Sequence, residues 1–219
     1  QLPDGRREGG LTFLLINISD PRVKIRPVIL IDGDHTVNEV TLESVHVPLE
    51  NMVGEQGKGW VYARPLLADE PAIVAGLGLT RVLLDKLREI LVSESCRGRA
   101  LFDDPAYRIQ FEKMLVEFNA LEFMELRRLH DKSTSSSSPI LTPILKLRGS
   151  ELRQRITELI IQALGERALE APHGSAESPS AHPYTDNLTQ RFLYERAVTI
   201  LGGSSEIQRN IIAGVELGL

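Results

Sequence analysis

The sequence predicts an α+β fold in which a short antiparallel β segment is followed by a bundle of antiparallel helices. Before Gly57, short β-branched segments alternate with turn residues, which is typical of strands. After Gly57, apolar residues recur at intervals of three and four, as on one face of a helix. We therefore divide the chain into residues 1–57, the end of a β-domain, and residues 58–219, a helical domain.

Three segments are predicted to be strands. Residues 10–18 are apolar enough for a strand buried on both faces, whereas residues 23–27 and 37–47 alternate between apolar and polar side chains. The turn Asp32-Gly33-Asp34 separates the last two. Since the first strand has no earlier strand to pair with, we expect the chain to begin in the middle of a sheet.

The first two predicted helices follow Gly57. One runs from about Trp60 to Val92, and the second begins at Asp104 with Pro105 in its first turn, a favoured entry. Their apolar stripes are formed by Leu77, Leu84, Leu87 and Leu91 and by Met114, Phe118, Leu121 and Met124. Trp60 is interpreted as filling a hydrophobic junction.

The third predicted helix carries the most regular apolar stripe, in which Gly149 would allow a neighbouring backbone to approach closely. That stripe consists of Leu145, Gly149, Leu152, Ile156, Leu159 and Ala163. The last helix begins at Ser204 or Ser205, and Ser205 and Gln208 have the spacing of a capping box. Residues 133–138 and 171–183 are predicted connectors.

Composition excludes several classes of protein. The 219 residues carry a net charge of −5, without the clustered Lys and Arg of a nucleic-acid-binding surface. No apolar run approaches the roughly 18 residues that span a membrane. The single cysteine, Cys96, cannot form an internal disulfide, and the five histidines lack metal-ligand spacing. We expect a cytoplasmic protein without a metal, and a packed or half-exposed Cys96.

Two groups of sequence phrases resemble the acyl-CoA dehydrogenase family, in order and with helices between them. The closing stretch Gly202–Ala213 reads Gly-Gly-Ser-Ser-Glu-Ile-Gln-Arg-Asn-Ile-Ile-Ala, similar to the family's closing signature. The phrases that resemble the family's β-domain and its exit are residues 10–15, 25–27, 38–40, 45–51, 53–55 and 57–60. Within the family, the sequence most resembles the bacterial branch that degrades unusual acyl-CoA esters. Some members of that branch are heteromeric.

The resemblance implies a four-helix-bundle-like C-terminal domain with an additional terminal helix. It also implies FAD-dependent α,β-dehydrogenation of an acyl-CoA thioester to a trans-2-enoyl-CoA, as in lipid catabolism, with electrons passing to an electron-transfer flavoprotein. Because family members share the cofactor site between subunits, a homo- or hetero-oligomer, dimer or tetramer, is expected. Family members also have an N-terminal helical domain and an earlier β segment, so we expect this chain to be a fragment.

The family places its catalytic glutamate at one of two positions. The commoner position is Gly202 here, which has no side chain. At the other position Glu70 matches, with Asp69 as the fallback; the alternative interpretation of Glu70 is an acidic residue in a first helical turn, favoured by the helix dipole. The arginine that usually follows is Pro71, which removes a charge and a backbone donor.

The FAD-binding residues are carried over in the same way. Arg99 and Phe102 have the spacing of the family's contact to the pyrophosphate of a neighbouring subunit. Arg97 and Arg108 are rivals for that role, and a solvated arginine at a helix end is the alternative.

Gln162 and Gly165 match the family's approach to the adenine part, although residues 166–168 depart from its glycine-rich continuation. Ser204 and Glu206 match contacts within the same subunit; helix capping is the alternative. Tyr194 and Arg196 either lie near the cofactor or belong to an amphipathic helix.

Two further functions remain open. A non-catalytic structural subunit of a heteromeric acyl-CoA dehydrogenase is favoured by Pro71, by Gly202 and by the altered segment after Gln162. An acyl-CoA oxidase would differ only in passing electrons to oxygen.

Overall fold

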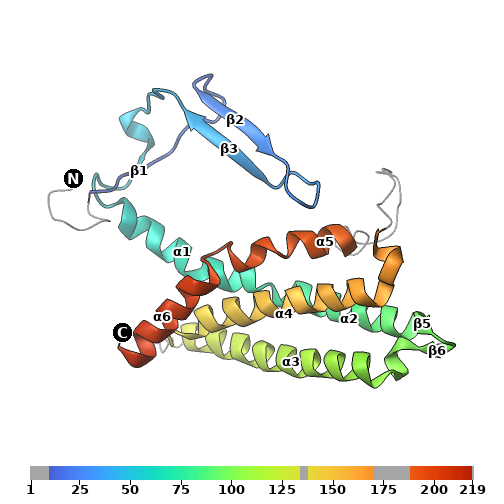
Figure 1. Ribbon diagram of the computed structural model, residues 1–219. Coiled ribbons are helices and arrows are strands. Elements are labelled where there is room, and N and C mark those ends of the chain that lie inside the picture. Colours follow the sequence, from blue (N-terminus) through green and yellow to red (C-terminus); the bar gives the residue numbers. More distant parts are fainter. Residues whose placement is uncertain (1–9, 134–137, 170–187, 219) are drawn as a thin grey trace. The chain divides into compact units, whose positions relative to one another are not determined.

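The computed structural model describes residues 10–133, 138–169 and 188–218 (Figure 1). They form two compact units, residues 1–70 and residues 71–219. The predicted connector at residues 171–183 lies outside the described residues, as does most of the connector at residues 133–138.

The described residues of the first unit form two small antiparallel sheets. In one, β1 (Phe13–Leu14) pairs with β4 (Met52–Val53). In the other, β2 (Val23–Val28) and β3 (Val37–Leu42) form a hairpin in which Val23 faces Leu42. A 3₁₀ turn, η1 (Leu49–Asn51), precedes β4. The antiparallel pairing of the second and third predicted strands is therefore confirmed.

The predicted strand lengths are partly wrong. Residues 10–18 form only the two-residue β1, and most of their large apolar side chains are exposed, because β1 pairs with two residues and no second layer among the described residues of this unit covers it. The strand predicted to reach Val47 ends at Leu42. There the chain turns at Ser44, whose φ of 53° is left-handed and incompatible with a continued strand.

In the part of the chain that the structure describes, six α-helices follow, the first of which crosses the division between the units. They are α1 (Gly59–Ala75), α2 (Leu77–Ser93), α3 (Pro105–Ser133), α4 (Leu141–Leu164), α5 (Leu188–Tyr194) and α6 (Ser205–Leu217). Shorter elements connect them: a hairpin of β5 (Ser95–Cys96) and β6 (Arg99–Ala100), and the 3₁₀ turns η2 (Leu101–Asp103), η3 (Gly165–Leu169) and η4 (Ala197–Thr199).

The core of the second unit lies where α2, α3 and α4 pack side by side, with α5 and α6 against α4 (Figure 1). The predicted stripes supply it, since Leu84, Phe118, Leu145, Leu152 and Ile156 are each at most 2% exposed. Burial of these stripes is the main stabilising contribution to the bundle. The α+β fold class with a C-terminal helical bundle is confirmed.

The single helix predicted from Trp60 to Val92 is wrong, because the chain breaks at Gly76 into α1 and α2. Gly76 has a left-handed φ of 60°, which glycine adopts without the penalty that a Cβ would add. The carbonyl oxygen of Val74, released by the break, accepts a 2.9 Å hydrogen bond from Nη2 of Arg153 on α4. Because apolar residues continue on both sides of Gly76, the sequence pattern does not indicate the break.

The close approach predicted at Gly149 is confirmed. A Cβ at this position would lie 2.9 Å from the carbonyl oxygen of Ala75, which is tighter than real contacts. The break between α1 and α2 thus rests directly on the backbone of α4. Arg153, one helical turn after Gly149, reaches the same break from the same face of α4.

We expect Gly76→Ala to lower the free energy of unfolding by about 2 to 4 kcal/mol. A Cβ there would be forced into the left-handed region and would overlap Nη1 of Arg153. The control is Gly78→Ala in α2, where φ is ordinary and open space surrounds the added Cβ. Denaturant unfolding should show no loss for that control, or a gain of up to about 1 kcal/mol. Equal effects of the two substitutions would contradict this account of the break.

Candidate functional site

A buried cluster of three charged side chains joins α4 to α5. Glu195, directly after α5, is fully buried and faces two guanidinium groups. Its Oε2 lies 3.2 Å from Nε of Arg153, and its Oε1 pairs with Nη2 of Arg191. Its backbone carbonyl accepts a 2.8 Å hydrogen bond from Gln154. Since two guanidinium groups share one carboxylate, the cluster has a net charge of +1.

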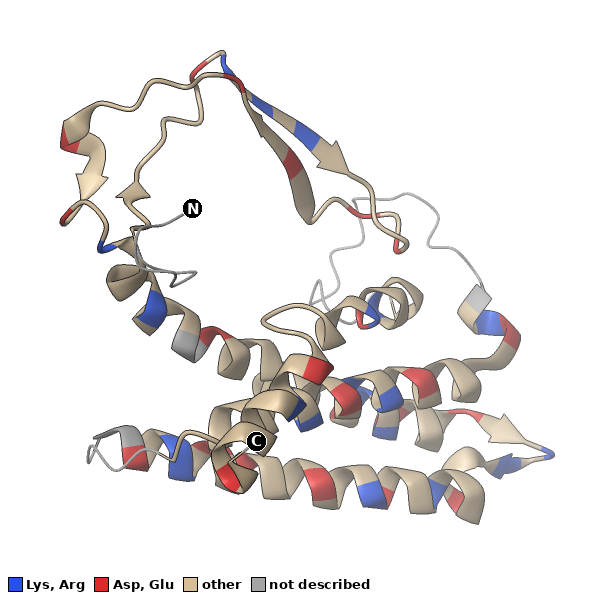
Figure 2. Cartoon of the chain, turned by 60° about the vertical axis from the view of Figure 1, so that its left-hand side comes forward, with Lys and Arg blue, Asp and Glu red and all other residues tan. Residues whose placement is uncertain are grey.

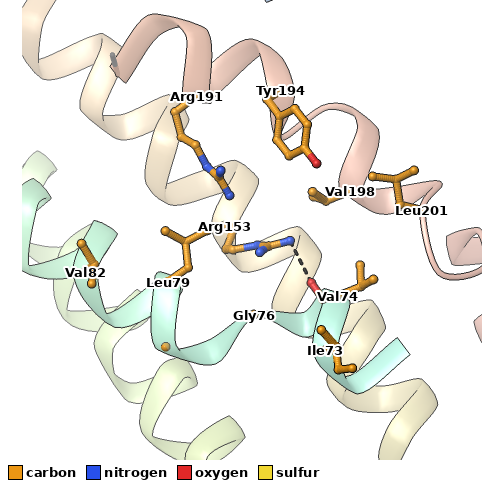
Figure 3. A pocket seen from close by; sticks show the side chains of 11 residues that line it. Ile73, Val74, Gly76, Leu79, Val82, Arg153, Arg191, Tyr194, Val198 and Leu201 are labelled. Atoms are coloured by element: carbon orange, nitrogen blue, oxygen red, sulfur yellow. Dashed lines mark hydrogen bonds between the residues drawn. The ribbon is translucent and has the colours of Figure 1, made fainter. Parts of the chain in front are cut away.

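A pocket of about 620 Å³ lies beside this cluster in the second unit. Figure 3 shows Arg153, Arg191 and Tyr194 directed from α4 and α5 towards the segment that contains Gly76. Apart from Gly78, the rest of the wall is apolar and consists of Ile73, Val74, Leu79, Val82, Val198 and Leu201. The volume falls within the range of small-molecule sites, and an apolar wall with a few convergent polar groups is their usual composition.

The wall of the pocket is cationic at neutral pH. Burial lowers the pKa of Arg153, and Glu195 opposes this shift, while Arg191 adds to it. An arginine begins from so high a pKa that it stays protonated. Burial also lowers the pKa of Lys146, which lies two turns earlier on α4, and Glu206 opposes that shift. No acidic side chain lines this pocket among the residues that the structure describes.

The loop before α6 is fixed to α4 by a buried lysine. Lys146 is fully buried and donates a 3.1 Å hydrogen bond to the carbonyl oxygen of Thr199. Gln208, also buried, donates a 3.2 Å hydrogen bond back to the carbonyl oxygen of Gly202. The first bond fixes the chain at Thr199, before the Gly202-Gly203 turn, and the second fixes the turn itself. From the sequence, the only role predicted for Gln208 was in a capping box.

The predicted capping box at Ser205 is wrong, because Ser204 is the N-cap. The Ser204 hydroxyl accepts a hydrogen bond from the backbone N–H of Ile207, whereas Ser205 is buried and its hydroxyl lies 3.5 Å from the carbonyl oxygen of Thr199. Hydrogen bonds from its own backbone N–H and from Ser204 lower the pKa of Glu206, so that its carboxylate is ionised at neutral pH.

Gly202 is constrained by its backbone as well as by its neighbours. Its φ is 64°, and a Cβ would lie 2.8 Å from Cγ2 of Val74 and 3.7 Å from Cα of Pro71. The closing signature and the end of α1 therefore meet at Gly202. Pro71 follows Glu70 directly in the chain, so the backbone links this junction to the second expected base position.

Glu70 lies in the second half of α1 and is exposed within this chain. The interpretation of Glu70 as a residue of a first helical turn is wrong, because α1 begins at Gly59. Pro71 accordingly lies in the helix interior, where it removes one backbone hydrogen bond. The side chain of Asp69 lies outside the described residues.

Four of the expected cofactor residues gather at one end of the bundle. Arg99 is exposed in β6, and Phe102 packs edge-to-face on Phe111 with ring centroids 5.8 Å apart. Gln162 is exposed in the last turn of α4, and Gly165 ends that helix with a φ of 58°.

An ion pair of 2.5 Å between Arg167, in η3, and Glu94, at the end of α2, links the two segments that carry these four residues. The rival Arg97 has a left-handed φ of 53° in the β5–β6 turn, and Arg108 lies in α3 within 3.8 Å of Glu112.

Ser204 and Glu206 lie near the other end of α4. Arg209 of α6 forms a 2.8 Å ion pair with Glu151, which is separated from Gly165 by about 21 Å along the helix axis. One chain therefore places the expected cofactor residues in two separate groups.

The cluster of Arg153, Arg191 and Glu195 was not found by sequence reasoning. A signal for part of it was present, since Arg191 and Glu195 have the i,i+4 spacing of a helical ion pair. Arg153 directly follows Leu152 of the apolar stripe, a position where a charged side chain requires a buried partner. Of the two residues left open, Tyr194 lines the pocket, whereas Arg196 is exposed and stacks over Phe192.

In the described residues, small antiparallel sheets are followed along the chain by a helical bundle on which the break between α1 and α2 packs. These features together indicate the class of protein to which the chain belongs. Residues 57–217 match the model of the acyl-CoA dehydrogenase C-terminal domain. The chain belongs to the acyl-CoA dehydrogenase family. It is 30% identical over 214 residues to acyl-CoA dehydrogenase IpdE1 of Mycobacterium tuberculosis, covering 98% of this chain and 52% of that protein.

Solved structures share the fold at lower identity. The glutaryl-coenzyme A dehydrogenase complex with glutaryl-CoA superimposes with a TM-score of 0.81 at 19% identity, over 96% of this chain and 51% of that one. The ChsE4–ChsE5 complex from M. tuberculosis gives a TM-score of 0.77 at 24% identity, over 97% and 54%. The chain thus spans about half the length of these relatives.

The remaining surface is mixed in charge. Figure 2 shows basic and acidic residues interleaved along the described helices. Among these helices, none combines the length and apolar character needed to cross a membrane. The described residues contain no group of three His, Cys, Asp or Glu side chains that could hold a metal ion. Cys96 is exposed in β5, so the expectation of a packed or half-exposed thiol is wrong, because both residues of this short strand face solvent.

We expect Gly202→Ala to lower the free energy of unfolding by about 2 to 3 kcal/mol, through backbone strain and the contact with Val74. Gly218→Ala is the matched control, because Gly218 has a similar φ of 68° with open space around it. Denaturant unfolding should show a smaller loss for the control. In a Val74→Ala background, Gly202→Ala should lower the free energy of unfolding by less than it does in the unaltered protein. An equal loss in the two backgrounds would exclude steric contact with Val74 as the cause of the destabilisation.

Proposed function

We propose that the chain is the C-terminal part of an FAD-dependent acyl-CoA dehydrogenase that oxidises an acyl-CoA thioester to a trans-2-enoyl-CoA. The observation that carries this proposal is the meeting of Gly202 with the end of α1, 3.7 Å from Pro71. Gly202, one base position of the family, thus meets the segment of α1 that directly follows Glu70, the other position, in the chain. A pocket with an apolar wall begins beside Gly202 at Val74 and Leu201.

Glu70 is the proposed base and takes the α-proton of the thioester. A carboxylate must be kept from bulk water to be basic enough for this proton, because desolvation raises its pKa. The exposure of Glu70 within this chain means that substrate, or protein outside these 219 residues, has to cover it. Gly202 offers no competing carboxylate, and its left-handed backbone opposes any side chain there.

The pocket beside Gly202 is the proposed site of the acyl group. Its walls at Ile73, Val74 and Leu201 are apolar and bury a hydrocarbon chain favourably. Hydrogen-bond donors at the thioester oxygen would stabilise the enolate that forms as the α-proton leaves. FAD, when bound, supplies the oxidising power by accepting hydride from the β-carbon.

The two groups of cofactor residues fit a site shared between subunits. Arg99 is exposed and suited to the pyrophosphate of a neighbouring subunit. The partly buried Phe102 holds the segment in place by packing on Phe111. In the same subunit, Ser204 lies at the N-terminus of α6, where backbone N–H groups favour phosphate. The ionised Glu206 repels phosphate and is assigned to a cofactor hydroxyl or amine. Gln162 and Gly165 are assigned to the adenine part.

An oligomer is proposed from the surface of α3. Three exposed apolar side chains, Ile109, Val116 and Phe123, recur every seven residues along this helix, a spacing typical of helix–helix interfaces. The assembly is a homo- or hetero-oligomer, dimer or tetramer, and the related ChsE4–ChsE5 assembly is itself a complex. An electron-transfer flavoprotein is the proposed oxidant, and the cytoplasm is the proposed location.

A non-catalytic subunit of a heteromeric acyl-CoA dehydrogenase is the second candidate function. Pro71 replaces the arginine that usually follows the base, and Gly202 is closed to a side chain by its own backbone. In this case the segment around Ser204 would complete or support a site whose base a partner provides.

The test is the visible spectrum of the purified full-length protein, alone and with a panel of acyl-CoA esters under anaerobic conditions. We expect bound flavin that is bleached by one class of ester. Glu70→Gln should reduce the rate of bleaching by about 100-fold or more, because it removes the proton acceptor but keeps the side-chain volume. Glu158→Gln, an exposed change on α4, is the control and should leave the rate unchanged.

Three outcomes would redirect the proposal. Unchanged bleaching in Glu70→Gln would remove Glu70 as the base, and Asp69→Asn would then be tested. Folded protein without flavin, or with flavin that no ester reduces, would support the non-catalytic subunit. Rapid reoxidation of the reduced flavin by oxygen would indicate an oxidase.

A further inference from the structure

We propose that the cationic wall of the pocket binds an ionised carboxylate at the far end of the acyl group. The preferred substrates are then acyl-CoA esters whose acyl group carries a second carboxylate. This inference rests on the proposed function for the identity of the ligand, whereas the pocket itself is defined by the described residues of the second unit.

The polar groups of the pocket are all suited to an acceptor. Arg153 and Arg191 can only donate hydrogen bonds, and the Tyr194 hydroxyl can donate one. In Figure 3, Leu201 and Val74 lie towards one side of the pocket and Arg191 and Val82 towards the other. An acyl group that enters beside Leu201 would therefore meet the apolar side chains of Val74 and Val198 together with Arg153 first, and the guanidinium of Arg191 further in.

The charge of the cluster is not balanced within the described residues. Glu195 is the one carboxylate shared by Arg153 and Arg191, and the nearby Lys146 and Glu206 offset each other. A net charge of +1 beside a largely apolar pocket is costly, and an anion in the pocket would relieve that cost. Nε of Arg191, Nε of Arg153 and both carboxylate oxygens of Glu195 are buried without a hydrogen bond of normal geometry among the described residues, so the three side chains pair only imperfectly with one another.

Arg191 is the side chain assigned to the ligand. Arg153 already uses Nη2 for the carbonyl oxygen of Val74 and Nε for Glu195, so it positions the wall. Arg191 uses Nη2 for Glu195 and keeps 13% of its side chain exposed. Its guanidinium also stacks over the ring of Tyr194, with Cζ 5.2 Å from the ring centroid. Stacking and pairing together fix the orientation of its guanidinium group.

A structural role for the cluster is the rival explanation. Arg191 would then only neutralise Glu195 and tie α5 to α4. This rival predicts that substitution of Arg191 changes stability without changing which ester binds. Discrimination between charged and neutral esters is therefore the decisive measurement.

The test uses calorimetric binding of adipoyl-CoA and of hexanoyl-CoA, which share a six-carbon chain, to the full-length holoprotein. We expect adipoyl-CoA to bind about 10-fold or more tightly, as for a hydrogen bond to a charged group. Arg191→Gln should abolish this ratio, and Tyr194→Phe should reduce it. Arg196→Gln is the control, because Arg196 is an exposed arginine of the same segment outside the pocket lining, and should leave the ratio unchanged.

Equal binding of the two esters by the unaltered protein would overturn the proposal, whether or not Arg191→Gln folds. A preference that persists in a folded Arg191→Gln would also overturn it. Flavin reduction separates this inference from the proposed reaction. Bleaching without a preference in binding would retain the reaction and reject the carboxylate site. A preference without bleaching by either ester would retain the site and reject the reaction.

Discussion

The architecture of the second unit depends on how the protein satisfies one buried cation, the guanidinium of Arg153. An unpaired charge at this depth would be strongly destabilising, so the surroundings must supply partners. They do so from two directions, through the carbonyl oxygen of Val74 at the end of α1 and the carboxylate of Glu195 after α5. The chain must break at Gly76 to free the first partner, and the segment after α5 must lie against α4 to bring the second.

This constraint links folding to the proposed chemistry. The same face of α4 carries Lys146, which fixes the loop before α6, and Gly149, which receives the backbone of Ala75. Both contacts draw the end of α1 and the closing signature onto one helix, so that Gly202 meets Val74. A site assembled this way has rigid walls made from distant parts of the sequence, which favours precise placement of a substrate.

Much of the bundle was predictable, because periodic apolar stripes and the small residue Gly149 report directly on packing. The break at Gly76 was not, because apolar residues continue on both sides of it. Burial of Arg153 was hidden for a different reason: its partner Glu195 is 42 residues away in the chain. The prediction of a longer, buried first strand was wrong because an apolar run indicates burial only where a second layer covers it. Glu70 was placed by resemblance alone, and no periodicity distinguishes it from an ordinary helical glutamate.

A double-mutant cycle on Arg153 and Glu195 tests the central claim most directly, through the free energies of unfolding of Arg153→Leu, Glu195→Leu and the double variant. We predict that each single substitution costs about 3 to 5 kcal/mol, because it strands a buried charge, and that the double variant loses less than either. Arg191 keeps some exposure and can turn to solvent in the double variant. Additive losses would mean that the two side chains act independently and that their pairing does not organise the fold.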